Sequence, residues 1–270
     1  MTQASDRAID RMTVVAIATV AYALANLIHE GLGHGGTCVV VGGRLTALSS
    51  VYAECAAEGR THLANSLATA AGTLANLLAG ATAWLLLRRQ EARPTSRRYF
   101  LWLFMTLNLL QGTGYWLFSG VANIGDWANL VADLEPLWLY RAILAMLGGA
   151  GYWGAIVLGL RTLNPLLGDG PDRLQRARTL SLIPYLAGGV LYVAAGALNP
   201  VGPLLVLISA GAASFGGVSA LAWMTELLRT RGYPAVSGVP LAIDRSLGWI
   251  ALAATTALVF AMIFGPGLRF

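Results

Sequence analysis

The sequence predicts an all-α membrane protein with about seven transmembrane helices, on the strength of three observations. Hydrophobic residues make up 56% of the 270 residues and charged residues only 11%, which leaves too little polar surface for a water-soluble domain. Apolar stretches of about 20 residues, long enough to cross a hydrocarbon layer of roughly 30 Å, recur between short polar breaks. Backbone polar groups need partners in lipid, so these stretches must be helices.

The expected spans follow one another along the whole chain, and the fifth and sixth meet at the tight turn Asn199-Pro200. The first carries polar residues at its far end and no small-residue cleavage site follows it, so we expect it to be retained. The seven spans cover residues 12–33, 62–87, 98–119, 137–160, 179–198, 201–225 and 246–265.

The basic residues indicate how the chain is oriented. All 18 are arginines, and 12 of them lie in the connections 88–98, 161–178 and 229–245. Cytoplasmic connections carry an excess of basic residues, so we expect these three and the N-terminus on the cytoplasmic side of a bacterial-type inner membrane. Residues 35–61 and the acidic connection around Asp126 then face outward. The net charge of +5 is thereby explained without a nucleic-acid partner.

Three ionisable residues lie within six positions at the end of the first span: His29, Glu30 and His34, in NLIHEGLGHGG. Such residues inside a span are rare and usually functional, because charge is costly in a low dielectric. In the pattern H-E-x-x-H, two histidines bind one zinc ion and the glutamate takes a proton from the metal-bound water. We therefore predict His29 and His34 as zinc ligands and Glu30 as the general base.

The second histidine comes one residue later than in that pattern. A spacing of five places two side chains about 140° apart on an ideal α-helix, too far round to share a metal. We expect the helix to deform here, because glycines at 31, 33, 35 and 36 tolerate unwinding and π-bulges concentrate at functional sites. In the alternative, the histidines bond to helix ends and Glu30 reaches the headgroups.

A catalytic zinc site needs a third protein ligand and leaves one position for water. Asp126 at the end of the third span and His62 at the start of the second both lie on the side of the histidine pair. We prefer Asp126 and keep His62 as the alternative. The competing interpretation is a helix cap or solvated carboxylate for Asp126 and an interfacial residue for His62.

The order of these features resembles the site-2 protease family of intramembrane zinc metalloproteases, over residues 26–127. The sequence departs from that family in the histidine spacing, in Gly125-Asp126-Trp127 where Leu-Asp-Gly is usual, and in a site that faces outward. Four segments carry the resemblance: His29-Glu30 with His34; Val39 to Tyr52, where Gly42-Gly43 separates two β-prone runs; Ala71-Gly72-Thr73-Leu74-Ala75-Asn76, with Thr73 in place of proline; and Asp126.

The resemblance implies that His29, His34 and Asp126 hold zinc and that Glu30 activates water for attack on a peptide carbonyl. It implies a β-hairpin after the first helix, whose edge would present an extended substrate by strand addition. It also divides the chain into a metalloprotease-like three-helix core, residues 1–135, and a four-helix extension, residues 136–270.

Two further expectations concern this outward side. Cys38 and Cys55 flank the expected hairpin, and an oxidising compartment favours a disulfide between them over free thiols. A helix in lipid must unwind before its amide bonds can be cleaved, and the hypothesis is that Asn65, Asn76 and Asn123 hydrogen-bond the unwound backbone.

The sequence therefore predicts a membrane-embedded, zinc-dependent and peptidase-like hydrolase that acts on a peptide or membrane-protein substrate in the bilayer. The alternative is a metal-binding membrane protein without peptidase activity, namely a scaffold, a regulator or a non-peptide hydrolase. A transporter is disfavoured, because midplane polar residues and repeat symmetry are scarce in the sequence.

Overall fold

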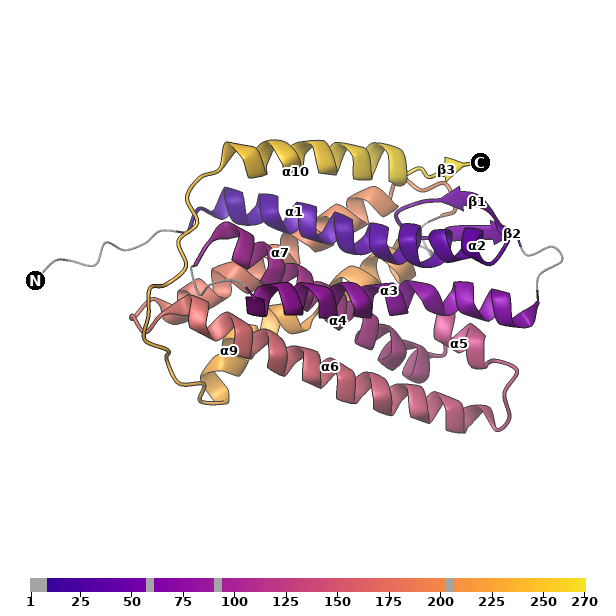
Figure 1. The fold of residues 1–270 in the computed structure, drawn as a ribbon, viewed down its shortest axis with the longest axis horizontal. Helices are drawn as coiled ribbons and strands as arrows, with labels where there is room; N and C mark the ends of the chain where they lie inside the picture. The colour runs from indigo at the N-terminus through magenta and orange to yellow at the C-terminus, as the bar shows by residue number, and fades with distance from the viewer. Residues whose placement is uncertain (1–8, 57–60, 90–93, 203–205) are drawn as a thin grey trace, which may run out of the picture.

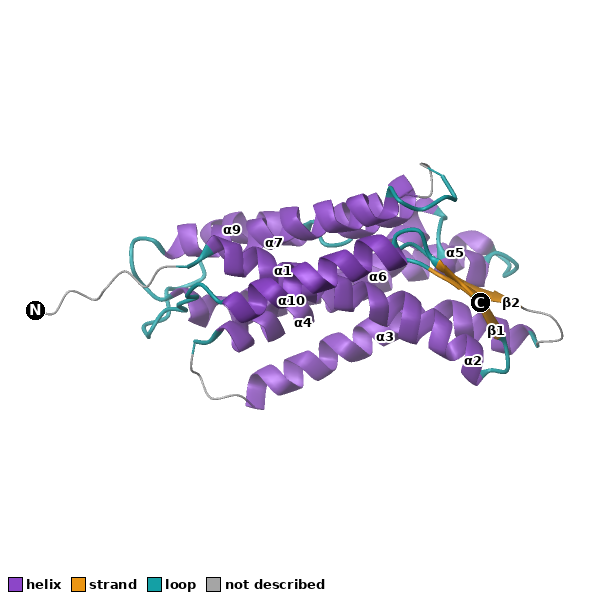
Figure 2. Cartoon of the chain, turned by 90° about the horizontal axis from the view of Figure 1, so that it is seen from above, coloured by secondary structure: helices purple, strands orange, loops and turns teal. Residues whose placement is uncertain are grey.

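The computed structural model describes residues 9–56, 61–89, 94–202 and 206–270, and most of them are helical (Figure 1). The long helices form a bundle, and a small sheet lies at one end of it beside α2 (Figure 2). The helical elements are α1 (Arg11–Leu27), η1 (Ile28–Gly36), α2 (Thr37–Val40), α3 (His62–Arg89), α4 (Ser96–Ala122), α5 (Asp126–Val131), α6 (Leu137–Leu167), α7 (Arg173–Gly196), η2 (Val206–Gly216), α9 (Ala220–Thr230), α10 (Leu247–Val259) and η3 (Phe260–Phe264).

Within the described residues, five helical segments are long and apolar enough to cross a membrane, which indicates a membrane protein. They are Arg11–Val40, His62–Arg89, Leu137–Leu167, Arg173–Gly196 and Leu247–Phe264. Two of the seven expected spans are not among them. The span expected at 98–119 lies within α4, which buries the polar residues Thr106 and Asn108 in the bundle. The span expected at 201–225 includes residues outside the described part and continues as η2 and α9.

The two halves of the chain share one hydrophobic core. Helix α4 packs against both α3 and α6, and α1 packs against α7 and α10. One buried cluster contains Tyr22 and Trp102 together with Leu160 and Phe260. A hydrogen bond also connects the two halves, since Nε1 of Trp102 donates to the Gly159 carbonyl at 2.9 Å. Residues 136–270 therefore pack around the first half as part of a single bundle.

The sheet has three strands in the order β2-β1-β3, with β1 (Arg44–Leu48) antiparallel to β2 (Ala53–Ala56) and to β3 (Leu268–Arg269). The hairpin lies later in the chain than the expected segment from Val39 to Tyr52, because Val39 and Val40 complete a helix. Gly42, at φ +80°, is the left-handed residue that follows this helix, a conformation glycine adopts without strain. Its position explains why the glycine pair is not the hairpin turn.

The true turn, residues 49–52, is closed by the hydroxyl of Ser49. This oxygen accepts hydrogen bonds from the backbone N–H groups of Val51 at 3.2 Å and Tyr52 at 3.1 Å. Cys38 in α2 and Cys55 in β2 form a disulfide. The disulfide fastens the edge strand to the end of the helix that carries the histidine motif.

Candidate metal centre

The histidine motif lies in η1, a π-helical continuation of α1. Residues five apart are one turn apart in a π-helix, so the rings of His29 and His34 face each other with their Nε2 atoms 3.2 Å apart. The deformation expected from the spacing is thus present. Gly33 permits the close packing of this segment on α3, because a Cβ at position 33 would lie 2.6 Å from the Cα of Gly72. Only glycine lets η1 approach α3 this closely.

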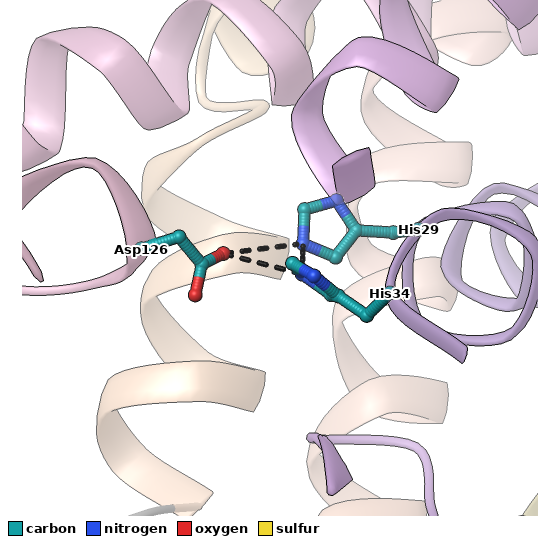
Figure 3. A group of neighbouring side chains, drawn as sticks. All are labelled: His29, His34 and Asp126. Carbon is teal, nitrogen blue, oxygen red and sulfur yellow. Dashed lines mark hydrogen bonds and ion pairs between the residues drawn. The ribbon is translucent and has the colours of Figure 1, made fainter. Parts of the chain in front are cut away.

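Asp126 reaches the two histidines from the opposite side of the cavity (Figure 3). It is the first residue of α5 and follows Gly125, which takes a positive φ of 92°. Its Oδ2 atom lies 3.2 Å from Nε2 of His34 and 3.9 Å from Nε2 of His29. The next residue, Trp127, donates from Nε1 to the Thr73 hydroxyl at 2.9 Å, which holds α5 against α3.

The three side chains fit a metal ion. Among the described residues, His29, His34 and Asp126 form the group that could hold one. The two Nε2 atoms and Oδ2 of Asp126 are separated by 3.2, 3.2 and 3.9 Å. The point equidistant from these three atoms lies about 2.0 Å from each, close to the usual Zn–N and Zn–O distances of about 2.0–2.2 Å. His62, the alternative third ligand, is not in this group. It begins α3 with an exposed side chain, and its Nδ1 atom lies 3.4 Å from the Ser66 hydroxyl.

The second nitrogen of each imidazole is fixed by a carbonyl oxygen. Nδ1 of His34 lies 2.8 Å from the Ala68 carbonyl, and Nδ1 of His29 lies 2.6 Å from Oδ1 of Asn76. The Asn76 amide is oriented by its nitrogen, which donates to Oδ1 of Asn108 at 2.8 Å. Nδ1 of each ring therefore donates to its carbonyl oxygen, and in the neutral form of each ring Nε2 presents a lone pair to a metal ion.

These lone pairs converge on a carboxylate oxygen that has no other partner. Oδ2 of Asp126 is buried and makes no hydrogen bond within the described part of the chain. With both Nε2 atoms unprotonated, two lone pairs and a negative charge would repel one another, and a cation between them, a metal ion or a proton, removes the repulsion. The electrostatics of the site thus agree with its geometry.

Glu30 lines the same cavity as the three ligand side chains. The cavity has a volume of ≈ 1070 Å³, and its walls come from the hairpin and from helices of both halves of the chain, α6, α7 and η2 included. Glu30 follows His29 directly on η1. A carboxylate beside a candidate metal site in a cavity is suited to proton transfer.

Two expected substrate-binding residues have other positions. Asn76 is fully buried behind His29 and does not line the cavity, so it orients a ligand. Asn123 is the left-handed C-cap of α4 and is exposed away from the cavity lining. Asn65 does line the cavity.

One face of α3 contributes residues to which the sequence analysis gave no role in positioning the histidines. Ala68, Gly72 and Asn76 are spaced four apart and share that face. A Cβ at Gly72 would collide with Nε2 of His34 and lie 2.8 Å from Nε2 of His29. The four-residue spacing of small and amide residues in an otherwise apolar span was the available signal.

Comparisons with protein-family models, with curated proteins and with solved structures give no match to this chain. A fold alone does not define an activity. The features of this chain that bear on function are the cavity, the group of His29, His34 and Asp126, and the hydrogen bonds that support it.

Proposed function

We propose that this protein is a membrane-embedded, zinc-dependent hydrolase with peptidase-like chemistry. The observation that carries the proposal is the convergence of Nε2 of His29, Nε2 of His34 and Oδ2 of Asp126, which are directed at one another. Two imidazoles and one carboxylate are a donor set typical of catalytic zinc, which keeps one position open. Structural zinc sites instead use four protein ligands.

Zinc in such a site supplies a Lewis acid that polarises a carbonyl group and lowers the pKa of water to about 7. Glu30 would take the proton from the attacking water and deliver it to the leaving amine as the C–N bond breaks. Asn76 and the Ala68 carbonyl would keep both imidazoles in the tautomer that presents Nε2. The cavity would exclude bulk water and admit an extended peptide segment beside β2, the edge strand.

We also propose that the site faces the outer side of a bacterial-type inner membrane, with the N-terminus in the cytoplasm. Helix α3 starts at His62, on the side of the metal centre, and ends at Arg88 and Arg89, and basic residues mark the cytoplasmic side. A disulfide between Cys38 and Cys55 suits an oxidising compartment. Both observations support the same orientation.

One observation favours a second function. Leu117, Phe118 and Val121 give the cavity an apolar wall, which would also accept an acyl chain. A metal-binding membrane protein without peptidase activity, such as a non-peptide hydrolase, a regulator or a scaffold, is therefore the second candidate.

The test replaces the base and keeps the ligands. Glu30→Gln should retain about one zinc per chain while cleavage of a library of membrane-derived peptides falls by about 10²–10⁴-fold, because proton transfer is lost. Glu54→Gln, at an exposed position of β2, is the matched control and should retain activity. Loss of zinc from Glu30→Gln would make Glu30 a ligand. Zinc-loaded wild type that cleaves no peptide would favour the second candidate.

A further inference from the structure

Asn26 and Ser50 line the cavity of the metal centre and carry polar atoms that the fold leaves unused. Both residues are deeply buried, at 9% and 5% exposure. Oδ1 of Asn26 and Oγ of Ser50 have no hydrogen-bond partner within the described ranges. A buried polar atom without a partner costs about 1–3 kcal/mol, so native proteins keep such atoms mainly where they have a role.

The orientation of the pair is fixed by the bonds it does make. The amide nitrogen of Asn26 donates to the Ser50 carbonyl at 2.9 Å, and the Ser50 backbone N–H donates to the Phe264 carbonyl at 2.7 Å. A flipped Asn26 amide would place two carbonyl oxygens in contact, so its Oδ1 atom is the free one. The pair thus offers one acceptor, Oδ1, in a fixed orientation and one hydroxyl donor, Oγ, on a backbone that is held in place.

The pair is placed beside the reacting groups. Asn26 lies one helical turn before Glu30 on the same helix, and Ser50 lies in the turn that leads into β2, the edge strand of the sheet. In an extended peptide, one residue presents its N–H and its C=O on the same edge. An acceptor and a donor side by side match that edge, whereas an ester-linked lipid has no N–H for Oδ1.

We propose that Asn26 and Ser50 form a subsite that binds the backbone of a peptide substrate, with Oδ1 of Asn26 accepting an N–H and the Ser50 hydroxyl donating to a C=O. This inference rests on the proposed hydrolase and narrows its substrate class to amides. A site built to bind an N–H rejects an analogue without one, because its own polar group is then left buried and unpaired. The subsite thereby selects peptides over esters.

The experiment uses a probe anchored by the metal: acetyl-Leu-Ala-Leu hydroxamate and three analogues, each with one backbone amide replaced by an ester. Their Kd values are measured by calorimetry on the full zinc-loaded protein in detergent. The analogue whose ester replaces the amide bound by Asn26 should bind wild type at least about tenfold more weakly than the parent compound. This factor corresponds to about 1.4 kcal/mol of binding free energy. Asn26→Leu, which removes the acceptor, should abolish this preference.

Two serine variants separate binding from folding. Ser50→Ala removes a buried hydroxyl that bonds to no described residue, so it should weaken binding of the parent compound and raise the thermal midpoint rather than lower it. Ser49→Ala removes the hydroxyl that closes the turn, so it should lower the thermal midpoint and leave the preference for amide unchanged. A structural role for Ser50 would produce the second result in both variants.

The failures of the two proposals are distinguishable. If wild type binds the parent and all three ester analogues equally, the hydroxamate still shows that the metal accepts a ligand. Only the Asn26–Ser50 subsite is then wrong. If zinc-loaded wild type binds none of the compounds, the hydrolase itself is wrong and the subsite falls with it. Tighter binding of an ester analogue would also overturn the subsite.

Discussion

The two ends of the helical bundle differ in whether their buried polar groups have hydrogen-bond partners. At the end that holds α9, Nη2 of Arg173 donates to Oδ1 of Asn164 at 2.6 Å and to the Tyr233 carbonyl at 3.0 Å. The Asn164 nitrogen donates to the Pro234 carbonyl at 2.9 Å. At the end that holds the sheet, Asn26, Ser50 and Asp126 line a cavity with unpaired oxygen atoms.

The difference indicates that the polar groups at one end hold the fold together and that those at the other end serve function. Paired polar groups at the α9 end hold connections of the chain in place, and of these atoms only Nε of Arg173 lacks a partner in the described residues. Unpaired groups at the sheet end lower stability unless a ligand completes them. Departures from good polar pairing are expected at functional sites. Substitutions at the two ends should therefore have different consequences.

The largest effect is expected at Gly72. Gly72→Ala should abolish zinc binding, because the added Cβ collides with Nε2 of both histidines. Gly154→Ala is the matched control, since a Cβ at this helical glycine meets no atom within 4 Å in the described structure, and it should bind zinc normally. Metal content of both purified variants checks this. Full zinc occupancy in Gly72→Ala would place the metal elsewhere.

A smaller effect is expected at Asn76. Asn76→Leu removes the oxygen that fixes the His29 tautomer, and loss of such a partner typically weakens metal binding by about 10–100-fold. Competition with a fluorescent zinc chelator measures the change in Kd. An unchanged Kd would show that His29 is not oriented through Asn76.

The opposite end provides the contrast. Asn164→Leu leaves Arg173 and the Pro234 carbonyl without their bonds, so the free energy of unfolding should fall by about 1–3 kcal/mol. Zinc content should stay the same, because the metal centre lies at the sheet end. A lower thermal midpoint in detergent with full zinc checks both parts. A parallel loss of zinc would contradict the separation of the two ends.

Much of the metal centre could be predicted because its signals are local in the sequence. His29, Glu30 and His34 stand out in an apolar span, and a five-residue spacing can serve one metal only if the helix widens, as η1 does. Asp126 is a carboxylate at the matching end of another helix. Ionisable residues are costly in lipid and therefore rare in apolar spans, so they can be recognised in the sequence.

The remaining features depend on tertiary contacts. The spacing of Ala68, Gly72 and Asn76 marks one face of α3, but the bond of Asn76 to His29 follows from the approach of η1 to α3, and Asn26 and Ser50 are neighbours only after the hairpin folds back. The hairpin was expected too early because the conformation of Gly42 depends on where the preceding helix ends. Strand β3 has two residues, too few for a periodicity.

The most direct test of the central claim is the metal content of the protein purified without chelator, by mass spectrometry. Wild type and His62→Ala should carry about one zinc per chain. The variants His29→Ala, His34→Ala and Asp126→Ala should each lose it, because each removes one of the three converging ligand atoms. A wild type that carries no metal and takes up none from added zinc would contradict the account.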